Sequence, residues 1–290
     1  MNYYLAKALN KLGLLRGITV AVSREINQST ICVPLVNSIG IENLQVSEMW
    51  MCQLLTDLIP LKNGAFIDVG VNVGQTLIKL RTVTTTMKYV GFEPNPRCVY
   101  YSNILIDVNR FEHCELIPVG LYDQDTVLAL SLFSENSADA SASVIPNFRA
   151  NSKVYKKIYV PVFRFESMSE ALDIGNLAIV KIDVEGAELE VLESLKSSIS
   201  LCRPILLMEI LPCYSEENDF RVSRQKRIEE IIDQIDYHII RVKKRDGNTI
   251  ETLEELKTIG IHGDEELCDY IISPSELTSK ILSGHRSHLE

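Results

Sequence analysis

The stretch FIDVGVNVGQT, residues 66–76, decides the fold class of this 290-residue chain. Phe66 and Val69 have the apolar character of a buried strand, and Gly70 and Gly74 permit backbone conformations that a side chain would forbid. The residues that follow suit the start of a helix. A strand, a glycine turn and a helix N-terminus in this order predict a ligand-binding turn. The free N–H groups and the positive dipole end of the helix favour an anionic group of the ligand.

Short runs rich in Val and Ile alternate with helix-like segments from residue 64 onward. This alternation predicts an α/β fold in which helices cover both faces of a mostly parallel, seven-stranded sheet. The predicted strands are residues 65–70, 88–94, 114–123, 177–186, 204–211, 237–243 and 268–274.

The chain divides in the sequence into an extension and one large domain. Residues 1–60 read as a helical and hairpin extension, and residues 61–288 as the main domain, with an inserted cover segment near residues 127–165 that is rich in Ser and Ala. The amphipathic N-terminal helix is expected to pack on the domain or on a second copy of the chain, so a homo-oligomer is one expectation. Leu289-Glu290 resembles a cloning scar.

Composition limits the classes of partner. The formal net charge of −10 and the pI near 5.1 argue against a nucleic-acid-binding face. The seven cysteines show neither a CxxC pair nor zinc-ligand spacing, which favours a reducing, cytoplasmic compartment. No apolar run approaches the roughly 18 residues of a transmembrane helix.

Acidic residues stand at the ends of the predicted strands, where ligands bind in open α/β sheets. Any one of them could instead cap a helix. Glu93 follows Gly74 by 19 residues, close to the spacing at which an acid accepts hydrogen bonds from a ribose diol. The acids at these ends are Asp68, Glu93, Asp123, Asp183, Glu185 and Glu209.

Four motifs occur in an order that narrows the prediction. FIDVGVNVGQT is followed by GFEPNP (91–96), KIDVEGAELEVLESL (181–195) and RPILLMEI (203–210). In order and spacing these motifs resemble the signatures of the FkbM family of methyltransferases. The resemblance implies a class I, Rossmann-like methyltransferase fold, S-adenosylmethionine as methyl donor, and a hydroxyl group of a sugar, glycan or natural product as acceptor.

The resemblance also implies residues that bind the cofactor. The backbone around Gly70 and Gly74 would hold its methionine end, Glu93 its ribose and Asp123 its adenine amino group. Phe92 would form an apolar wall beside the adenosine, although a buried strand residue is an equally good interpretation. The candidate cofactor-binding residues are Asp68, Gly70, Asn72, Gly74, Phe92, Glu93 and Asp123.

Asp183 and Glu209 are the candidate catalytic residues. They end two strands that are expected to be neighbours, so their carboxylates should lie close together. The pair could provide a general base, hold the ammonium group of the cofactor, or bind a divalent metal such as Mg²⁺. The sequence offers no complete set of metal ligands, so the metal is the weakest of the three.

Two alternative functions remain open in the sequence. A nicotinamide-dependent oxidoreductase would use the same strand, glycine turn and Glu93, although the glycine spacing fits a dinucleotide poorly. A non-catalytic subunit that binds S-adenosylmethionine is the other, and the presence of both Asp183 and Glu209 argues against it.

Overall fold

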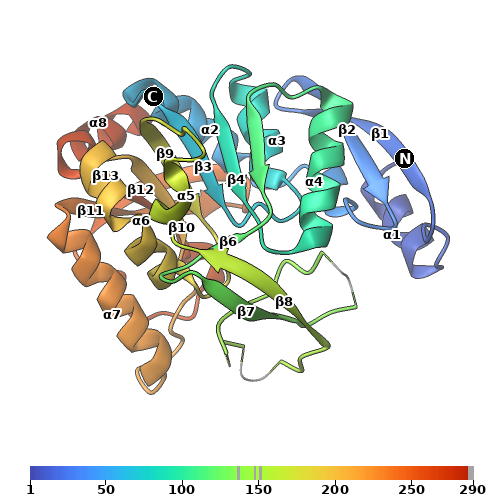
Figure 1. Cartoon of the computed structure of the whole chain (residues 1–290). Coiled ribbons are helices and arrows are strands. Elements are labelled where there is room, and N and C mark those ends of the chain that lie inside the picture. Colours follow the sequence, from blue (N-terminus) through green and yellow to red (C-terminus); the bar gives the residue numbers. More distant parts are fainter. Residues whose placement is uncertain (136–137, 147, 150–151, 287–290) are drawn as a thin grey trace.

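The computed structural model describes residues 1–135, 138–146, 148–149 and 152–286. Its central element is a mixed sheet in which the described residues form eight strands (Figure 1). In spatial order the strands are β12 (Thr249–Leu256), β11 (Tyr237–Arg245), β13 (Asp269–Pro274), β10 (Ile205–Glu209), β9 (Leu177–Ile182), β3 (Ala65–Val69), β4 (Tyr89–Phe92) and β5 (Cys114–Ile117).

The strands β10, β9, β3, β4 and β5 are parallel to one another, whereas β13 is antiparallel to both β10 and β11. From β3 the chain moves outward to β4 and β5, and it later returns to the other side of β3 as β9. The direction of winding therefore reverses between β3 and β9. In open α/β sheets a crevice for ligands forms outside the carboxyl ends of the strands at such a reversal.

Helices cover both faces of the sheet. Because successive side chains of a strand point to opposite faces, Ile67 and Val69 pack into one apolar cluster and Phe66 into the other. The first cluster takes its helical side chains from α6 (Glu188–Cys202) and α7 (Asp219–Gln234), and the second takes them from α2 (Trp50–Leu58), α3 (Gln75–Val83) and α8 (Ser275–Arg286).

The structure corrects the predicted strands in two places: one predicted strand is divided, and one strand was missed. The segment predicted as one strand at 114–123 divides into β5 and β6 (Gly120–Leu121), since Pro118 cannot donate to a sheet and the chain turns there into a second sheet. The edge strand β12 was not predicted. It pairs with β11 through a tight turn at Asp246 and Gly247, both with positive φ.

The second sheet has three strands, in the order β6, β8 (Lys156–Phe163) and β7 (Thr126–Leu132). It follows β5 in the chain, and the described parts of residues 133–155 connect β7 to β8. The short helix α5 (Glu166–Ser169) then leads to β9.

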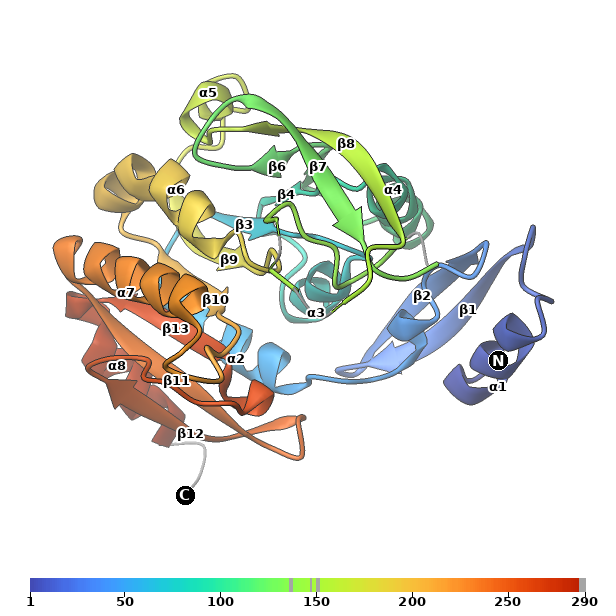
Figure 2. The same ribbon diagram turned by 90° about the horizontal axis from the view of Figure 1, so that it is seen from below.

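The N-terminal residues form α1 (Tyr3–Lys11) and the antiparallel hairpin of β1 (Thr19–Ile26) and β2 (Ser29–Val36). Figures 1 and 2 show this part at one end of the molecule, with α7 and α8 at the opposite end. The hairpin packs on α4 (Pro96–Asn109) in a third apolar cluster. The described residues also form 3₁₀ turns at Glu42–Leu44, Ile59–Leu61 and Glu265–Leu267. Among the described residues, no helix has the length and apolar character that crossing a membrane requires.

Candidate functional site

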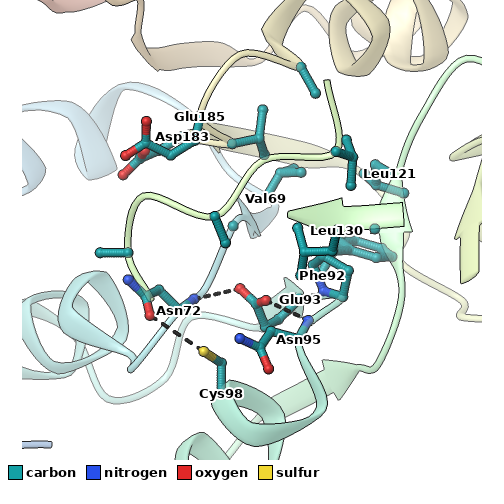
Figure 3. Close-up of a pocket in the computed structure, with 18 of the residues that line it drawn as sticks. Val69, Asn72, Phe92, Glu93, Asn95, Cys98, Leu121, Leu130, Asp183 and Glu185 are labelled. Carbon is teal, nitrogen blue, oxygen red and sulfur yellow. Dashed lines mark hydrogen bonds between the residues drawn. The ribbon is translucent and has the colours of Figure 1, made fainter. Parts of the chain in front are cut away.

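A cavity of about 240 Å³ lies at the carboxyl ends of β3, β4, β9 and β10, where the winding of the sheet reverses (Figure 3). Six of the nine predicted site residues line it: Gly70, Asn72, Phe92, Glu93, Asp183 and Glu209. The other three, Asp68, Gly74 and Asp123, are not part of the lining that the described residues form.

Glu93 is held in one orientation by two backbone donors. The N–H of Asn72 donates to its Oε2 and the N–H of Asn95 to its Oε1, each at 2.7 Å (Figure 3). Its side chain is only 6% exposed, and this burial raises the pKa of the Glu93 carboxyl to about 7, although both N–H groups oppose the shift. Each carboxylate oxygen keeps a second lone pair, so Glu93 can still accept hydrogen bonds from a ligand.

The glycine turn is shaped by its protein neighbours. Gly70 has a φ of 90°, and a Cβ there would lie 1.9 Å from the carbonyl oxygen of Asp183. Gly74 has a φ of 73° and caps α3, and a Cβ there would lie 2.7 Å from Cδ2 of Leu105. The absence of a side chain at Gly70 thus lets the turn lie close to the end of β9. The absence of a side chain at Gly74 lets α3 pack closely on α4.

The two ends of the cavity differ in polarity. Phe92, Leu121 and Leu130 form one side, and Asp183 and Glu185 lie at the other (Figure 3). The Phe92 ring is fully buried and packs edge-on against Phe165, with ring centroids 6.1 Å apart. A ligand with a flat apolar group and a distant positive charge would match this division.

The acidic end contains a chain of charged and polar groups that begins below the cavity. The fully buried Asp68 accepts a hydrogen bond from the Tyr89 hydroxyl at 2.8 Å. The Lys181 ammonium lies 3.0 Å from Asp183 Oδ2 and 3.7 Å from Asp68 Oδ1. Burial raises the pKa of Asp68, and Lys181 opposes that shift. Asp68 therefore supports the site from beneath, through Lys181.

Asp183 and Glu209 share a hydrogen bond between their carboxyl groups. The negative charge of Asp183, together with burial, raises the pKa of Glu209 from 4.5 to about 10. The pKa of Asp183 is lowered, chiefly by the Lys181 ammonium, against the opposing effect of its burial. The Lys181 ammonium, 3.0 Å from Asp183, favours the negative charge there, so in this coupled pair Asp183 is the more acidic carboxyl and Glu209 holds a proton more readily.

The described part of the cover segment closes one side of this cavity. Asp139, Ala140, Ala142 and Val144 belong to the lining. Residues 136–137, 147 and 150–151 of the segment lie outside the described residues, as does the suggested scar at 289–290.

The cover segment is tied to the loop after β9. The Ser143 hydroxyl donates to the carbonyl of Glu185 at 2.7 Å, and the Arg149 guanidinium lies 2.6 Å from the Glu185 carboxylate. Asp123, by contrast, is exposed in the turn between β6 and β7.

Sequence reasoning missed several residues of the lining. Glu48 and Gln75 reach it from the segment before α2 and from the first turn of α3, and Cys98 reaches it from α4. Asn95 could have been found, because it follows Glu93 by two residues in GFEPNP and its N–H holds the Glu93 carboxylate. The others carry no local signal.

No metal-ligand cluster supports the magnesium alternative. Within the described ranges, no group of three or more His, Cys, Asp and Glu side chains is placed to hold a metal ion. Asp183 and Glu209 form a pair without a third such ligand.

Comparisons with known proteins place the chain in a family. The family model for the methyltransferase FkbM domain matches residues 68–245, more than half of the chain. No curated protein matches the sequence.

Solved structures similar to this one are distant in sequence. An FkbM methyltransferase from Methylobacillus flagellatus is 17% identical, with a TM-score of 0.43; the match covers 72% of this chain and 43% of that one, so this chain spans less than half of that protein. A putative caffeoyl-CoA O-methyltransferase from Staphylococcus aureus is 11% identical, with a TM-score of 0.46 and coverage of 80% and 87%. The SAH-bound Podospora anserina methyltransferase PaMTH1 is 10% identical, with a TM-score of 0.40 and coverage of 72% and 76%.

The family match agrees with the strand order and with the motifs, and it confirms the expected class I, Rossmann-like fold. It favours methyl transfer over the nicotinamide chemistry that the sequence left open. The chain belongs to the FkbM family of methyltransferases.

Proposed function

We propose that the protein transfers a methyl group from S-adenosylmethionine to a hydroxyl group of a sugar, glycan or natural product. The observation that carries this proposal is the position of the Asp183 carboxyl group, which lines the cavity at the end opposite its apolar wall and lies 3.0 Å from the Lys181 ammonium that favours its charged form. A hydroxyl keeps its proton at neutral pH, so a base beside the reacting oxygen is the group that O-methylation needs.

The cavity fits the methyl donor in three respects. Glu93 can accept hydrogen bonds from the two ribose hydroxyls, since its own backbone partners leave one lone pair free on each oxygen. The side formed by Phe92, Leu121 and Leu130 suits the adenine ring. The negative charge of Asp183 suits the positive charges of the ammonium and sulfonium groups.

The proposed chemistry requires little from the protein. S-adenosylmethionine supplies a methyl group that its sulfonium already activates. The acceptor oxygen attacks that methyl carbon in line, the new O–C bond forms as the S–C bond breaks, and Asp183 takes the hydroxyl proton. Although its pKa is lowered, the carboxylate suffices as a base, because the hydroxyl becomes strongly acidic as its oxygen acquires the methyl group.

Lys181 and Glu209 would orient Asp183. The ammonium of Lys181 and the carboxyl proton of Glu209 both bind the Asp183 carboxylate, so its rotation is restricted. A fixed base contributes more to the rate than a mobile one, because its alignment is not lost to conformational entropy. Neither group needs to touch the acceptor.

Calorimetric titration tests the donor. We expect binding of S-adenosylmethionine and of its demethylated product, S-adenosylhomocysteine, and no appreciable binding of a nicotinamide dinucleotide. Binding of the dinucleotide alone would refute the assignment.

Transfer of a labelled methyl group to a panel of hydroxylated and aminated compounds tests the acceptor. Mass spectrometry and NMR of the product should locate the label on oxygen. Label found only on nitrogen or carbon would contradict O-methylation, and donor binding without transfer to any acceptor would favour a non-catalytic role. Transfer that survives thorough chelation would exclude the magnesium alternative.

A further inference from the structure

A second cavity, of about 260 Å³, adjoins the first. The two cavities share Glu48, Gln75, Asp183 and Glu209 in their linings. Asp183 therefore faces both spaces. If the first holds the donor, the second is where an acceptor oxygen can approach the same carboxylate.

The second cavity is rich in carboxylates. With Glu209 protonated, its lining still carries five acidic side chains against two ammonium groups, those of Lys181 and Lys244. The acids are Glu48, Asp183, Glu265, Glu266 and Asp269.

Both lysines are engaged beneath the surface. Lys244 is only 9% exposed, and its ammonium lies 2.8 Å from Asp269 Oδ2 and 3.6 Å from Glu266 Oε2. Lys181 is 10% exposed and is paired with Asp183. A ligand would therefore meet mainly hydrogen-bond acceptors, since a carboxylate oxygen can accept further bonds while it pairs with a lysine.

Several of the acids also face the open space. The side chains of Glu48 and Glu266 are 51% and 70% exposed, although Glu48 pairs with Lys79 at 2.5 Å. Counting Lys79 as a third ammonium group still leaves the acids in excess. An anionic group in this cavity would be repelled, and a cationic one attracted.

Trp50 belongs to the lining of the same cavity, but its ring is not an open face. The side chain is almost fully buried, and the Lys244 ammonium lies over the ring, 5.6 Å from its centroid. Its indole N–H has no hydrogen-bond partner among the residues that the structure describes, so the cavity also contains a donor that a ligand hydroxyl can satisfy.

We propose, resting on the function proposed above, that the second cavity holds the acceptor and that this acceptor carries several hydroxyl groups and an ammonium group, as an amino sugar does. The hydroxyl and ammonium protons would be accepted by the carboxylates, and one hydroxyl would face Asp183. Acceptors with a phosphate or carboxylate on the part that enters the cavity are disfavoured by the same charges.

Three probes that share one ring test this charge preference. Glucosamine, glucose and glucuronate differ chiefly in charge, and their affinities can be compared by NMR titration at low ionic strength, with the protein saturated by S-adenosylhomocysteine. We expect affinity to fall in that order, by on the order of tenfold or more between the first and the last. Tightest binding of glucuronate, or binding of none of the three, would overturn the inference.

Two substitutions of Glu266 test whether a preference for the positively charged probe arises in this cavity. Glu266→Lys should reduce the ratio of glucosamine to glucuronate affinity by roughly tenfold, and Glu266→Gln should reduce it less. Glu170→Lys makes the same change at an exposed position beside α5, away from the cavity, and should leave the ratio unchanged. An unchanged ratio in Glu266→Lys would refute the assignment of the cavity.

The binding of S-adenosylhomocysteine is measured first and separates the two proposals. If it fails, the proposed methyl transfer fails with it. If it holds while the probes show the opposite preference, only the assignment of the acceptor is wrong.

Discussion

Replacing Glu209 by Gln should leave the protein active and make it more stable at alkaline pH, whereas replacing Asp183 by Asn should greatly reduce turnover. The two carboxyl groups look equivalent in the sequence, each at the end of a strand. In the structure they differ, because Lys181 contacts Asp183 and the pair keeps its proton on Glu209. A glutamine resembles the protonated Glu209 and can donate an N–H to Asp183 in place of the O–H.

The stability change follows from the raised pKa of Glu209. The folded protein holds this proton up to about pH 10, while the unfolded chain releases it near the usual value of 4.5. Between these values the folded state binds more protons, so its stability falls as pH rises, by up to about 1.4 kcal/mol per pH unit for one proton. Glu209→Gln removes this dependence. Its stability relative to the unsubstituted protein should therefore increase steadily from pH 6 to pH 9.

The effect on turnover should be opposite for the two variants. Asp183→Asn removes the charge that accepts the proton, and we expect a loss of roughly 10²- to 10⁴-fold in kcat. The substitution also removes one of the two carboxylate partners of the buried Lys181 and leaves Asp68, at 3.7 Å, as the other. We therefore expect the folded state to be destabilised by about 2–4 kcal/mol. Glu209→Gln should change kcat by less than about tenfold, since Asp183 keeps both its charge and a hydrogen bond.

Urea denaturation at pH 6, 7, 8 and 9 and steady-state kinetics at pH 7.5 provide the measurements. Glu170→Gln, on the exposed surface, serves as the control for replacing a glutamate by glutamine. An equal loss of turnover in Glu209→Gln and Asp183→Asn would show that the charge is not confined to Asp183. A stability difference that does not vary with pH would refute the raised pKa of Glu209. The loss of one attractive charge should weaken cofactor binding modestly in Asp183→Asn; a collapse of that affinity would make Asp183 a binding residue and place the base elsewhere.

Three further outcomes are expected. Glu93→Ala should weaken the binding of S-adenosylmethionine by on the order of 1–3 kcal/mol in calorimetry, without unfolding the protein. In the unsubstituted protein the affinity for S-adenosylmethionine should decline below about pH 7, because Glu93 then gains a proton and no longer accepts both hydrogen bonds from the ribose. Arg149→Ala, which removes the ion pair to the loop after β9, should speed amide hydrogen exchange in residues 138–146; unchanged exchange would show that this ion pair does not hold the cover. Gly70→Ala should cost at least about 3 kcal/mol in urea denaturation, because its Cβ meets the Asp183 carbonyl, while Gly13→Ala, with a similar positive φ and open space, should cost about 1 kcal/mol; equal costs would contradict the steric argument.

The fold could be predicted to the extent that its strands are buried on both faces. Strands β3, β9 and β10 consist of apolar residues apart from one charged residue each, Asp68, Lys181 and Glu209, and such nearly continuous runs are visible in a sequence. The edge strand β12 is half-exposed, and its sequence TIETLEEL carries four acidic or hydroxyl side chains among the first six residues, so its apolar pattern was too weak to notice. The Asp246-Gly247 turn was the available signal for this hairpin.

The site could be predicted only where the chain order determines position. The acids at strand ends had to lie along one edge of the sheet, and Glu93, Asp183 and Glu209 do line the cavity there. Asp68 also ends a strand, but its side chain bonds Tyr89 beneath the cavity, because one residue along a strand changes the face on which a side chain lies. Glu48 joins the site from a segment before α2, and only the folded chain brings it there.

The glycine turn connects the two halves of the proposed site. The N–H of Asp183 donates to the carbonyl of Val69 at 3.0 Å, so the chain leaving β9 lies directly against the chain leaving β3. At that point the Asp183 carbonyl occupies the space where Gly70 would carry a Cβ. A larger residue at 70 would separate the two strand ends and move the Asp183 carboxylate away from the turn, in which the N–H of Asn72 binds Glu93. Gly70 is therefore needed for a reason beyond ligand binding: it sets the distance between the residue proposed to bind the ribose and the carboxylate proposed to take the proton.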